Sequence, residues 1–146
     1  MLVDTHAHIY EEYYPDQIEA VLARATAAGV GRLVVPAVDL ASSVEAVRLS
    51  RRRTNLYAAV GIHPGEVDNV GESDLEQLEN FLLASRENRI VAVGEAGIDY
   101  HYTRANAGLQ KVIFKAQIKL ACRYDLPLII HCLLYTSDAA DDSPPV

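Results

Sequence analysis

Short, mostly apolar runs and amphipathic stretches alternate along this chain. The apolar runs are typical of buried strands, and they lie at residues 2–5, 32–35, 56–62, 90–93 and 126–130. Between them, four stretches repeat apolar residues at helical spacing, and these cover residues 16–28, 40–53, 73–82 and 109–120. The pattern therefore predicts a β-α unit repeated four times and followed by a fifth strand.

Three of the predicted helices carry signals at one end. Gly29 follows the first helical stretch, and glycine is common where a helix ends. The basic run 51–53 closes the second, where cations offset the helix dipole. Ser73 and Glu76 have the spacing of a capping box, which predicts that the third helix begins directly after Ser73.

Apolar strands that alternate with amphipathic helices favour a parallel sheet covered by helices. Two architectures have this order, a (β/α)8 barrel and an open, doubly wound sheet. No Gly-x-Gly-x-x-Gly motif follows the first strand, so the signal of a dinucleotide-binding sheet is missing. The barrel is favoured because polar residues gather where the strands end. The fold class is therefore α/β, and the favoured architecture is a partial TIM (β/α)8 barrel with about five of its eight strands.

Composition and charge narrow the range of functions. The chain has 146 residues, of which 50% are hydrophobic and 23% charged, which suits one globular domain. No apolar run reaches the roughly 18 residues of a membrane span, and the N-terminal MLVDTHAH lacks the pattern of a signal peptide, so we expect a cytoplasmic protein. The net charge is −7, and the sequence has no broad basic face for nucleic acid. Bound metal ions could nevertheless supply positive charge for a nucleic-acid substrate.

The histidines concentrate where predicted strands end. None of the five falls on a predicted helix face; two follow the first strand, one the third and one the fourth, and one closes the fifth: His6, His8, His63, His101 and His131. In a TIM barrel the carboxyl ends of the strands carry the chemistry. The placement therefore points to one site shared by several strands.

His6 and His8 form a His-x-His pair. Two residues apart on a strand, both imidazoles point to the same side and can share one metal ion. The pair is also compatible with simple polar residues at a strand end, but its place after the first strand of a β/α chain favours a metal. Asp4, just before the pair, either orients a ligand imidazole or caps the strand.

Glu95 lies in the segment VGEAGIDY, just past the fourth predicted strand. A carboxylate there can bridge two cations, or bind one and orient water. Gly94 and Gly97 indicate tight backbone geometry, which is unusual around an ordinary loop acid. Asp99 is either a support for a metal ligand or a helix-entry residue.

Two histidines admit several roles. His131 ends LPLIIH and is either a satisfied core residue or, in company with the His-x-His pair and Glu95, a metal ligand. His63 in GIHP could contact a substrate phosphate, support a ligand, or shape the loop before Pro64. We expect His101 to be exposed to solvent.

A tyrosine cluster follows the His-x-His pair. Tyr10, Tyr13 and Tyr14 could stack nucleobases. Packing within the loop is the commoner role of such residues, and we favour it for this cluster.

Taken together, these blocks resemble the TatD family of metal-dependent hydrolases. The resemblance rests on DTHAH, GIHP, VGEAGIDY, LPLIIH and the series Gln110, Phe114, Gln117, in this order and spacing, and runs from Met1 to His131. It implies a cytoplasmic TIM-barrel phosphodiesterase that binds two divalent metal ions (Mg, Mn or Zn) and acts on DNA as a deoxyribonuclease.

The resemblance also implies roles for individual residues. His6 and His8 would bind one metal, Glu95 would bridge as the catalytic carboxylate, and His131 would bind the second metal, with His63 close by. Metal-activated water would then cleave the phosphodiester bond. Two other interpretations stay open: another His-x-His barrel enzyme acting on amides, lactones or phosphate monoesters, or a non-catalytic half-barrel.

The sequence departs from the family pattern in its length. A TIM barrel takes about 250 residues and eight strands, and five strands are predicted for this chain. The family's further ligands, a histidine after strand six and an aspartate after strand eight, have no counterpart. We therefore expect residues 1–131 to form the N-terminal part of a TatD-like barrel, with unpaired edges at the first and fifth strands and no activity of its own.

Residues 132–146 have a different character. The segment CLLYTSDAADDSPPV has no helical face and carries three uncompensated acids. Its first ten residues correspond to the codons TGT CTC TTA TAC ACA TCT GAC GCT GCC GAC, which resemble the end of a transposase-based sequencing adapter. We interpret this tail as non-native adapter read-through; a genuine short linker or a degraded C-terminus is the competing interpretation.

Overall fold

A computed structural model describes residues 1–101 and 106–133 of the chain. It contains five strands, β1 (Leu2–Asp4), β2 (Val30–Pro36), β3 (Leu56–Val60), β4 (Ile90–Asp99) and β5 (Leu128–Leu133). The α-helices are α1 (Ile18–Ala27), α2 (Leu40–Arg52), α3 (Asp74–Leu83), α4 (Ser85–Asn88) and α5 (Ala107–Arg123), and η1 (Pro64–Asn69) is a 3-10 helix. Among these described helices, none combines the length and apolarity needed to cross a bilayer.

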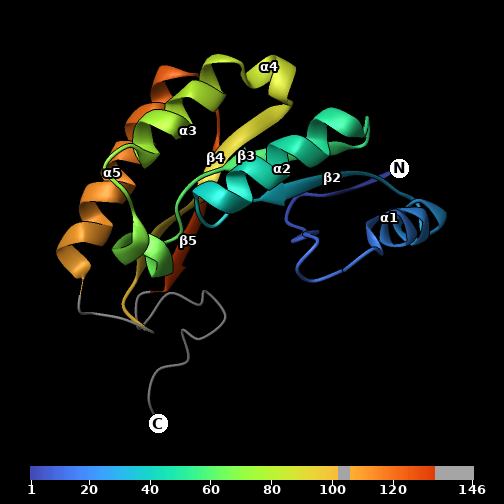
Figure 1. The fold of residues 1–146 in the computed structure, drawn as a ribbon, viewed down its shortest axis with the longest axis horizontal. Coiled ribbons are helices and arrows are strands. Elements are labelled where there is room, and N and C mark those ends of the chain that lie inside the picture. Colours follow the sequence, from blue (N-terminus) through green and yellow to red (C-terminus); the bar gives the residue numbers. More distant parts are fainter. Residues whose placement is uncertain (102–105, 134–146) are drawn as a thin grey trace, which may run out of the picture.

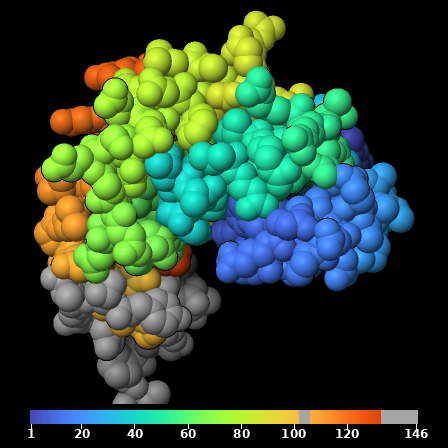
Figure 2. Space-filling model, in the orientation of Figure 1, coloured from blue at the N-terminus to red at the C-terminus, as the bar shows by residue number. Residues whose placement is uncertain are grey.

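The five strands form one parallel sheet in the order β1-β2-β3-β4-β5. The sheet is curved, and α2, α3 and α5 lie on its outer side, with α1 beside β2 (Figure 1). Side chains of α2 and α3 form the middle of the face seen in Figure 2. This curled half-barrel confirms the predicted fold class and its strand count, and β1 and β5 are its edges, as expected.

The core lies between the helices and the sheet. Strand residues that face the helices are fully buried, as Val35, Leu56 and Val60 are, and they pack against helix residues such as Leu49 and Leu78. Helix α2 packs on β2 and β3, and α5 packs on β4. The pattern of the sequence therefore predicted the order of the strands and of the four longer helices, but it did not predict η1 and α4.

Two of the differences between the predicted and observed strand boundaries affect the candidate site. The strand predicted at 90–93 continues to Asp99, so Glu95 lies inside β4 and not in a loop after it. The fifth strand continues to Leu133, so His131 lies within it and does not close it. The register between β4 and β5 shifts between Val93 and Ala96. Beyond that shift the pairing resumes at Ala96, where β4 contains the small or polar residues Ala96, Gly97 and Asp99, which hydrophobic periodicity does not detect.

The predicted capping box at Ser73 and Glu76 is wrong. Ser73 precedes α3 but makes no side-chain cap hydrogen bond; its hydroxyl instead accepts from the Gln77 amide at 3.0 Å. The capping box of this structure lies at α2, where the Asp39 carboxylate accepts from the Ser42 backbone N–H at 2.7 Å and the Ser42 hydroxyl accepts from the Asp39 N–H. Serine at the third helical position replaces the usual glutamate there, which hid the motif.

We expect Asp39→Ala to lower the free energy of unfolding by about 1 kcal/mol, because the first turn of α2 loses its cap. Ser73→Ala is the matched control and should change stability by no more than a few tenths of a kcal/mol. Urea unfolding followed by circular dichroism measures both. Equal losses in the two variants would contradict the assignment of the cap to α2.

The strand edges carry exposed apolar side chains. Leu2 is 63% exposed and Val3 52% exposed in β1, and Ile130 is 59% exposed in β5. The tail interpreted as adapter read-through lies, from residue 134 on, outside the described residues.

Candidate metal site

Glu95 occupies the centre of a cluster at the carboxyl ends of the strands. Its backbone N–H donates to the Ala37 carbonyl at 2.8 Å, which ties β4 to the end of β2. Its side chain is buried, at 7% exposure for the residue. A buried carboxylate requires partners to offset the loss of hydration, and histidines from both sides of it supply them.

His6 and His8 approach one oxygen of this carboxylate. The Nε2 atoms of His6 and His8 lie 3.4 Å and 3.2 Å from Glu95 Oε2. The pair lies in the loop after β1, not on the strand as predicted, because β1 ends at Asp4. The Ala7 N–H donates to the Val34 carbonyl at 3.0 Å and so fixes this loop against β2 with both imidazoles on the same side.

His131 approaches the other oxygen. Its Nδ1 lies 3.6 Å from Glu95 Oε1, and its Nε2 lies 3.4 Å from Asp99 Oδ2. Asp99 is buried at 2% exposure at the end of β4, so it is placed to orient the His131 ring. The His63 ring lies edge-on to His131 with centroids 4.2 Å apart.

These contacts make two groups that share one residue. In each group the possible ligand atoms lie within 4.8 Å of one another: His6, His8 and Glu95 in the first, and His63, Glu95 and His131 in the second. Imidazole and carboxylate donors in this number suit zinc, manganese and related divalent ions. The donor set therefore fits divalent metal ions, and the shared carboxylate directs one oxygen to each group.

Electrostatics favour the ionised form of Glu95. Burial acts to raise its pKa, but a hydrogen bond with His8 and the charges of His6, His8 and His63 act in the opposite direction, and the net pKa lies below its ordinary value. Burial and the neighbouring His131 lower the pKa of His63. A carboxylate beside a neutral imidazole is the protonation state in which such groups interact with cations.

Two glycines of β4 allow its backbone to lie close to the backbone of β5. Gly94 has φ +143°, where L side chains are rare, and a Cβ there would lie 2.6 Å from the Ile129 carbonyl oxygen. A Cβ on Gly97 would overlap the carbonyl oxygen of His131. The predicted tight geometry around Glu95 is therefore present, and it serves the packing of β5.

Two buried glutamines of α5 bind the backbone at the ends of β3 and β4. Gln117 accepts from the Ile62 N–H at 2.8 Å and donates to the Ile62 carbonyl at 2.9 Å. Gln110 does the same for Asp99, at 2.8 Å and 3.1 Å. Both glutamines are fully buried. Each side-chain amide thus pairs with both backbone polar groups of one residue. Ile62 directly precedes His63, and Asp99 contacts His131 within the cluster.

We expect Gln117→Met to lower the free energy of unfolding by about 2 to 3 kcal/mol, because the change leaves a buried N–H and a buried C=O of Ile62 without these partners. Ile118→Met is the control, since Ile118 is the next residue of α5 but is 37% exposed, and it should cost less than about 1 kcal/mol. Thermal unfolding compares the two. Equal costs would show that the hydrogen bonds of Gln117 contribute little.

The remaining predicted residues lie at the edge of the cluster or outside it. The Asp4 carboxylate accepts from the His6 backbone N–H at 3.0 Å, which caps the end of β1. His101 is exposed to solvent, as expected. The sequence motifs include Gln110 and Gln117 but indicate no role for them. Their spacing of seven residues places both on one helix face, and this was the available signal that they face the same neighbours.

An open groove of about 520 Å³ lies over Glu95. Its lining contains the three histidines His8, His63 and His131 together with Glu66, Tyr13 and Val38. The groove opens at the carboxyl ends of the strands, which is where a parallel barrel presents its chemistry. A parallel half-barrel with histidines gathered around a buried carboxylate at this end presents a candidate site for divalent metal ions.

The chain belongs to the TatD related DNase family, whose sequence profile matches residues 3–142. It is similar to the uncharacterized metal-dependent hydrolase YabD of Bacillus subtilis, with 37% identity over 97% of this chain and 53% of that protein. It is also similar to the deoxyribonuclease Tat-D of Schizosaccharomyces pombe, with 35% identity over 84% of this chain and 43% of that protein.

The crystal structure of YjjV, a TatD homologue from Escherichia coli, superposes with a TM-score of 0.81 at 39% identity, covering 89% of this chain and 50% of that one. The fold match confirms the expected TIM-barrel relationship. The chain spans about half the length of the curated relatives it matches.

Proposed function

We propose that the complete protein hydrolyses phosphodiester bonds of DNA with the help of two divalent metal ions. The observation that carries the proposal is the shared carboxylate: Glu95 Oε2 faces His6 and His8, and Oε1 faces His131. A bridging carboxylate between two cations is a recurrent feature of two-metal sites. The nucleic-acid substrate follows the name of the Schizosaccharomyces pombe relative, a deoxyribonuclease.

His6, His8 and Glu95 would hold one ion, and Glu95 and His131 the other; magnesium, manganese and zinc are the candidate ions. When bound, such ions lower the pKa of water and stabilise the leaving oxygen of a phosphodiester. Glu95 would contribute negative charge to both ions, and we propose it as the catalytic carboxylate. Asp99 holds the ring of His131 in the orientation that turns Nδ1 toward Glu95.

His63 is suited to bind substrate. Its Nδ1 accepts from the Gly65 backbone N–H at 2.9 Å, so the neutral ring carries its proton on Nε2. An N–H at Nε2 can donate to a phosphate oxygen but cannot ligate a metal ion. We therefore assign His63 to the phosphate and not to the ligand set.

The test uses a chimera of residues 1–131 and the C-terminal half of Escherichia coli YjjV. We expect the chimera to cleave single-stranded DNA only with added metal, and the same chimera carrying Glu95→Gln to be inactive. The 146-residue chain by itself is expected to be inactive. A folded, metal-binding chimera that hydrolyses amides, lactones or phosphate monoesters but not DNA would contradict the proposal and favour another His-x-His barrel enzyme.

The division of the chain is part of the same proposal. Residues 1–131 form the N-terminal part of a TatD barrel, and residues 132–146 are adapter read-through. Sequencing the nucleotides that encode residues 131–146 tests this: we expect the adapter codons, beginning TGT CTC TTA TAC ACA. Different codons that continue into genomic sequence would contradict it and would support a non-catalytic half-barrel.

A further inference from the structure

A groove of about 470 Å³ lies on the outer side of the half-barrel, between α2 and α3. We call it the arginine groove. It is lined by Val44, Val47, Arg48, Arg51 and Arg52 of α2 and by Phe81 of α3. The face that these two helices present occupies the middle of the view in Figure 2. The arginine groove shares no residue with the groove over Glu95, so the two are separate sites.

The arginine groove belongs to the middle of the fold. Helix α2 packs on β2 and β3, and α3 follows β3 in the chain. The edges of the sheet are β1 and β5, which contribute no residue to the groove. Further strands at either edge would therefore leave the groove in place.

The floor of the groove is apolar, and one of its side chains is poorly covered. Val47 is buried, and Phe81 packs against the core. Val44, in contrast, is 49% exposed although it lies inside α2. An aliphatic side chain of a partner that covered Val44 would remove apolar surface from water, which is favourable.

Three arginines surround this floor. Arg48, Arg51 and Arg52 lie one to two turns beyond Val44 on α2, and no acidic side chain lines the groove. Arg51 and Arg52 belong to the last turn of the helix, where they offset its dipole. Arg48 precedes that turn, so the dipole does not account for it. The groove is thus locally positive on a chain whose net charge is −7.

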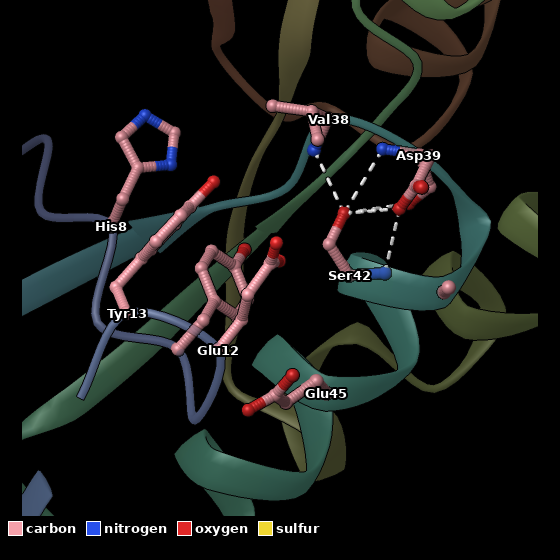
Figure 3. Close-up of a pocket in the computed structure, with 9 residues that line it drawn as sticks. His8, Glu12, Tyr13, Val38, Asp39, Ser42 and Glu45 are labelled. Carbon is pink, nitrogen blue, oxygen red and sulfur yellow. Dashed lines mark hydrogen bonds between the residues drawn. The ribbon is translucent and has the colours of Figure 1, made fainter. Parts of the chain in front are cut away.

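The single acidic residue of α2, Glu45, is engaged elsewhere. Its carboxylate lies 3.8 Å from the guanidinium of Arg48 but accepts a hydrogen bond from the Glu11 N–H at 2.9 Å. It lines a different hollow, beside the loop that carries His8 (Figure 3). Within residues 1–101 and 106–133, no acidic side chain forms an ion pair with Arg51 or Arg52. The arginines can therefore pair with anionic groups of another molecule.

The shape and lining of the groove favour a protein segment as its occupant. A small-molecule site encloses most of its ligand, whereas this groove is open to solvent. A nucleic-acid strand would offer phosphates, but its bases need an open aromatic ring for stacking, and the one ring in the lining, Phe81, packs against the core. An amphipathic helix brings aliphatic side chains and carboxylates together, and such helices bind in grooves of this kind.

We propose that the arginine groove is a docking site for an acidic amphipathic helix of a partner protein. Aliphatic side chains of that helix cover Val44, and its carboxylates pair with the three arginines. Arginine forms two-pronged hydrogen bonds with carboxylates and is enriched at protein–protein interfaces. Docking here leaves the groove over Glu95 open, so the partner tethers the protein without blocking that site. The inference does not depend on the proposed hydrolysis.

The first test uses a fluorescein-labelled synthetic peptide with leucines at positions i, i+3, i+4 and i+7 and glutamates between them. Fluorescence anisotropy measures its binding to the 146-residue chain. One matched peptide has glutamine for every glutamate, and another has serine for every leucine. We expect each of them to bind about tenfold more weakly. Equal binding of the glutamate and glutamine peptides, or no binding of the glutamate peptide up to about 1 mM, would overturn the proposal.

The second test removes charge from the protein. We expect Arg51→Gln with Arg52→Gln to weaken binding of the glutamate peptide about tenfold. Arg24→Gln with Arg32→Gln is the control, because it makes the same change of charge at exposed residues outside the groove. This control should bind within about twofold of the unchanged chain. Equal losses in the two double variants would show attraction by overall charge alone and would overturn the site.

The third test concerns the apolar floor. We expect Val44→Ser to weaken binding of the glutamate peptide about fivefold. Val112→Ser is the control, since Val112 is also exposed, at 61%, but lies on α5; it should leave binding unchanged. Circular dichroism confirms that each variant is folded. Equal affinities of the two serine variants would show that Val44 is not covered by the peptide and would contradict the proposal.

Two further measurements identify other occupants. If labelled oligothymidylate binds more tightly than the glutamate peptide and loses affinity in the Arg51→Gln, Arg52→Gln variant, the groove takes a nucleic-acid backbone and the proposal is overturned. If sedimentation shows a dimer of the chain that the same variant abolishes, the occupant is a second copy and the proposal is likewise overturned. We expect weaker binding of oligothymidylate and no such dimer.

Discussion

Replacing Glu95 by glutamine is expected to lower the affinity of the chain for Zn²⁺ or Mn²⁺ at least a hundredfold. Loss of a residue that merely supports a metal ligand typically costs about 10- to 100-fold, and Glu95 contacts both histidine groups directly. The amide also lacks the negative charge that offsets the charge of the ions. Isothermal titration calorimetry of the 146-residue chain measures the change.

Glu66→Gln is the matched control for this experiment. Glu66 lines the same groove but belongs to neither of the two ligand groups found among the described residues. We expect its metal affinity to stay within about twofold of the unchanged chain. If both variants bind metal equally well, Glu95 is not the shared ligand and the two-metal arrangement fails.

Gly97→Ala is expected to lower the free energy of unfolding by on the order of 3 to 5 kcal/mol. This loss is larger than the losses expected for Asp39→Ala and Gln117→Met. The added Cβ would overlap the backbone carbonyl oxygen of His131, and backbone atoms cannot rotate away as the end of a side chain can. Relief requires β5 to separate from β4 at the pair Gly97 and His131. Urea unfolding measures the loss of stability. We also expect weaker metal binding in this variant, because His131 moves with β5.

Gly108→Ala provides the control for the same chemical change. Gly108 lies in α5, and a Cβ there would have no atom within 4 Å. Alanine in a helix is favoured over glycine by roughly 0.5 to 1 kcal/mol, so this variant should be slightly more stable than the unchanged chain. A Gly97→Ala variant as stable as Gly108→Ala would show that β4 and β5 are not held at this distance.

The order of elements followed from the sequence because periodicity reports which face of a helix or strand is buried. The placement of His6 and His63 after strand ends could be predicted for the same reason. The position of Glu95 inside β4 could not, since VGEAGIDY contains small and polar residues that mask a strand. The capping box at Asp39 and Ser42 was also hidden, because its serine takes the place of the usual glutamate.

The two-sided environment of Glu95 lay beyond local patterns altogether. Its two carboxylate oxygens face residues separated by more than 100 positions in the chain, His6 and His131, and only the curvature and register of the sheet bring these together. The roles of Gln110 and Gln117 depend in the same way on where α5 lies across β3 and β4. To predict such contacts, one needs the geometry of the sheet as well as the identity of the residues.

The sequential order of the sheet has a consequence for how the protein forms on the ribosome. Each strand pairs with the next strand in the chain, so partners in register lie between 23 residues apart, as for Val34 and Tyr57, and 35 residues apart, as for Val93 and Leu128. Within the described sheet, every new strand therefore meets an already formed neighbour soon after its synthesis. The side that holds His6, His8 and Glu95 is assembled once β4 has emerged, whereas the side that includes His131 waits for β5. During translation the nascent chain thus acquires its two ligand groups one after the other, in the order in which its strands are made.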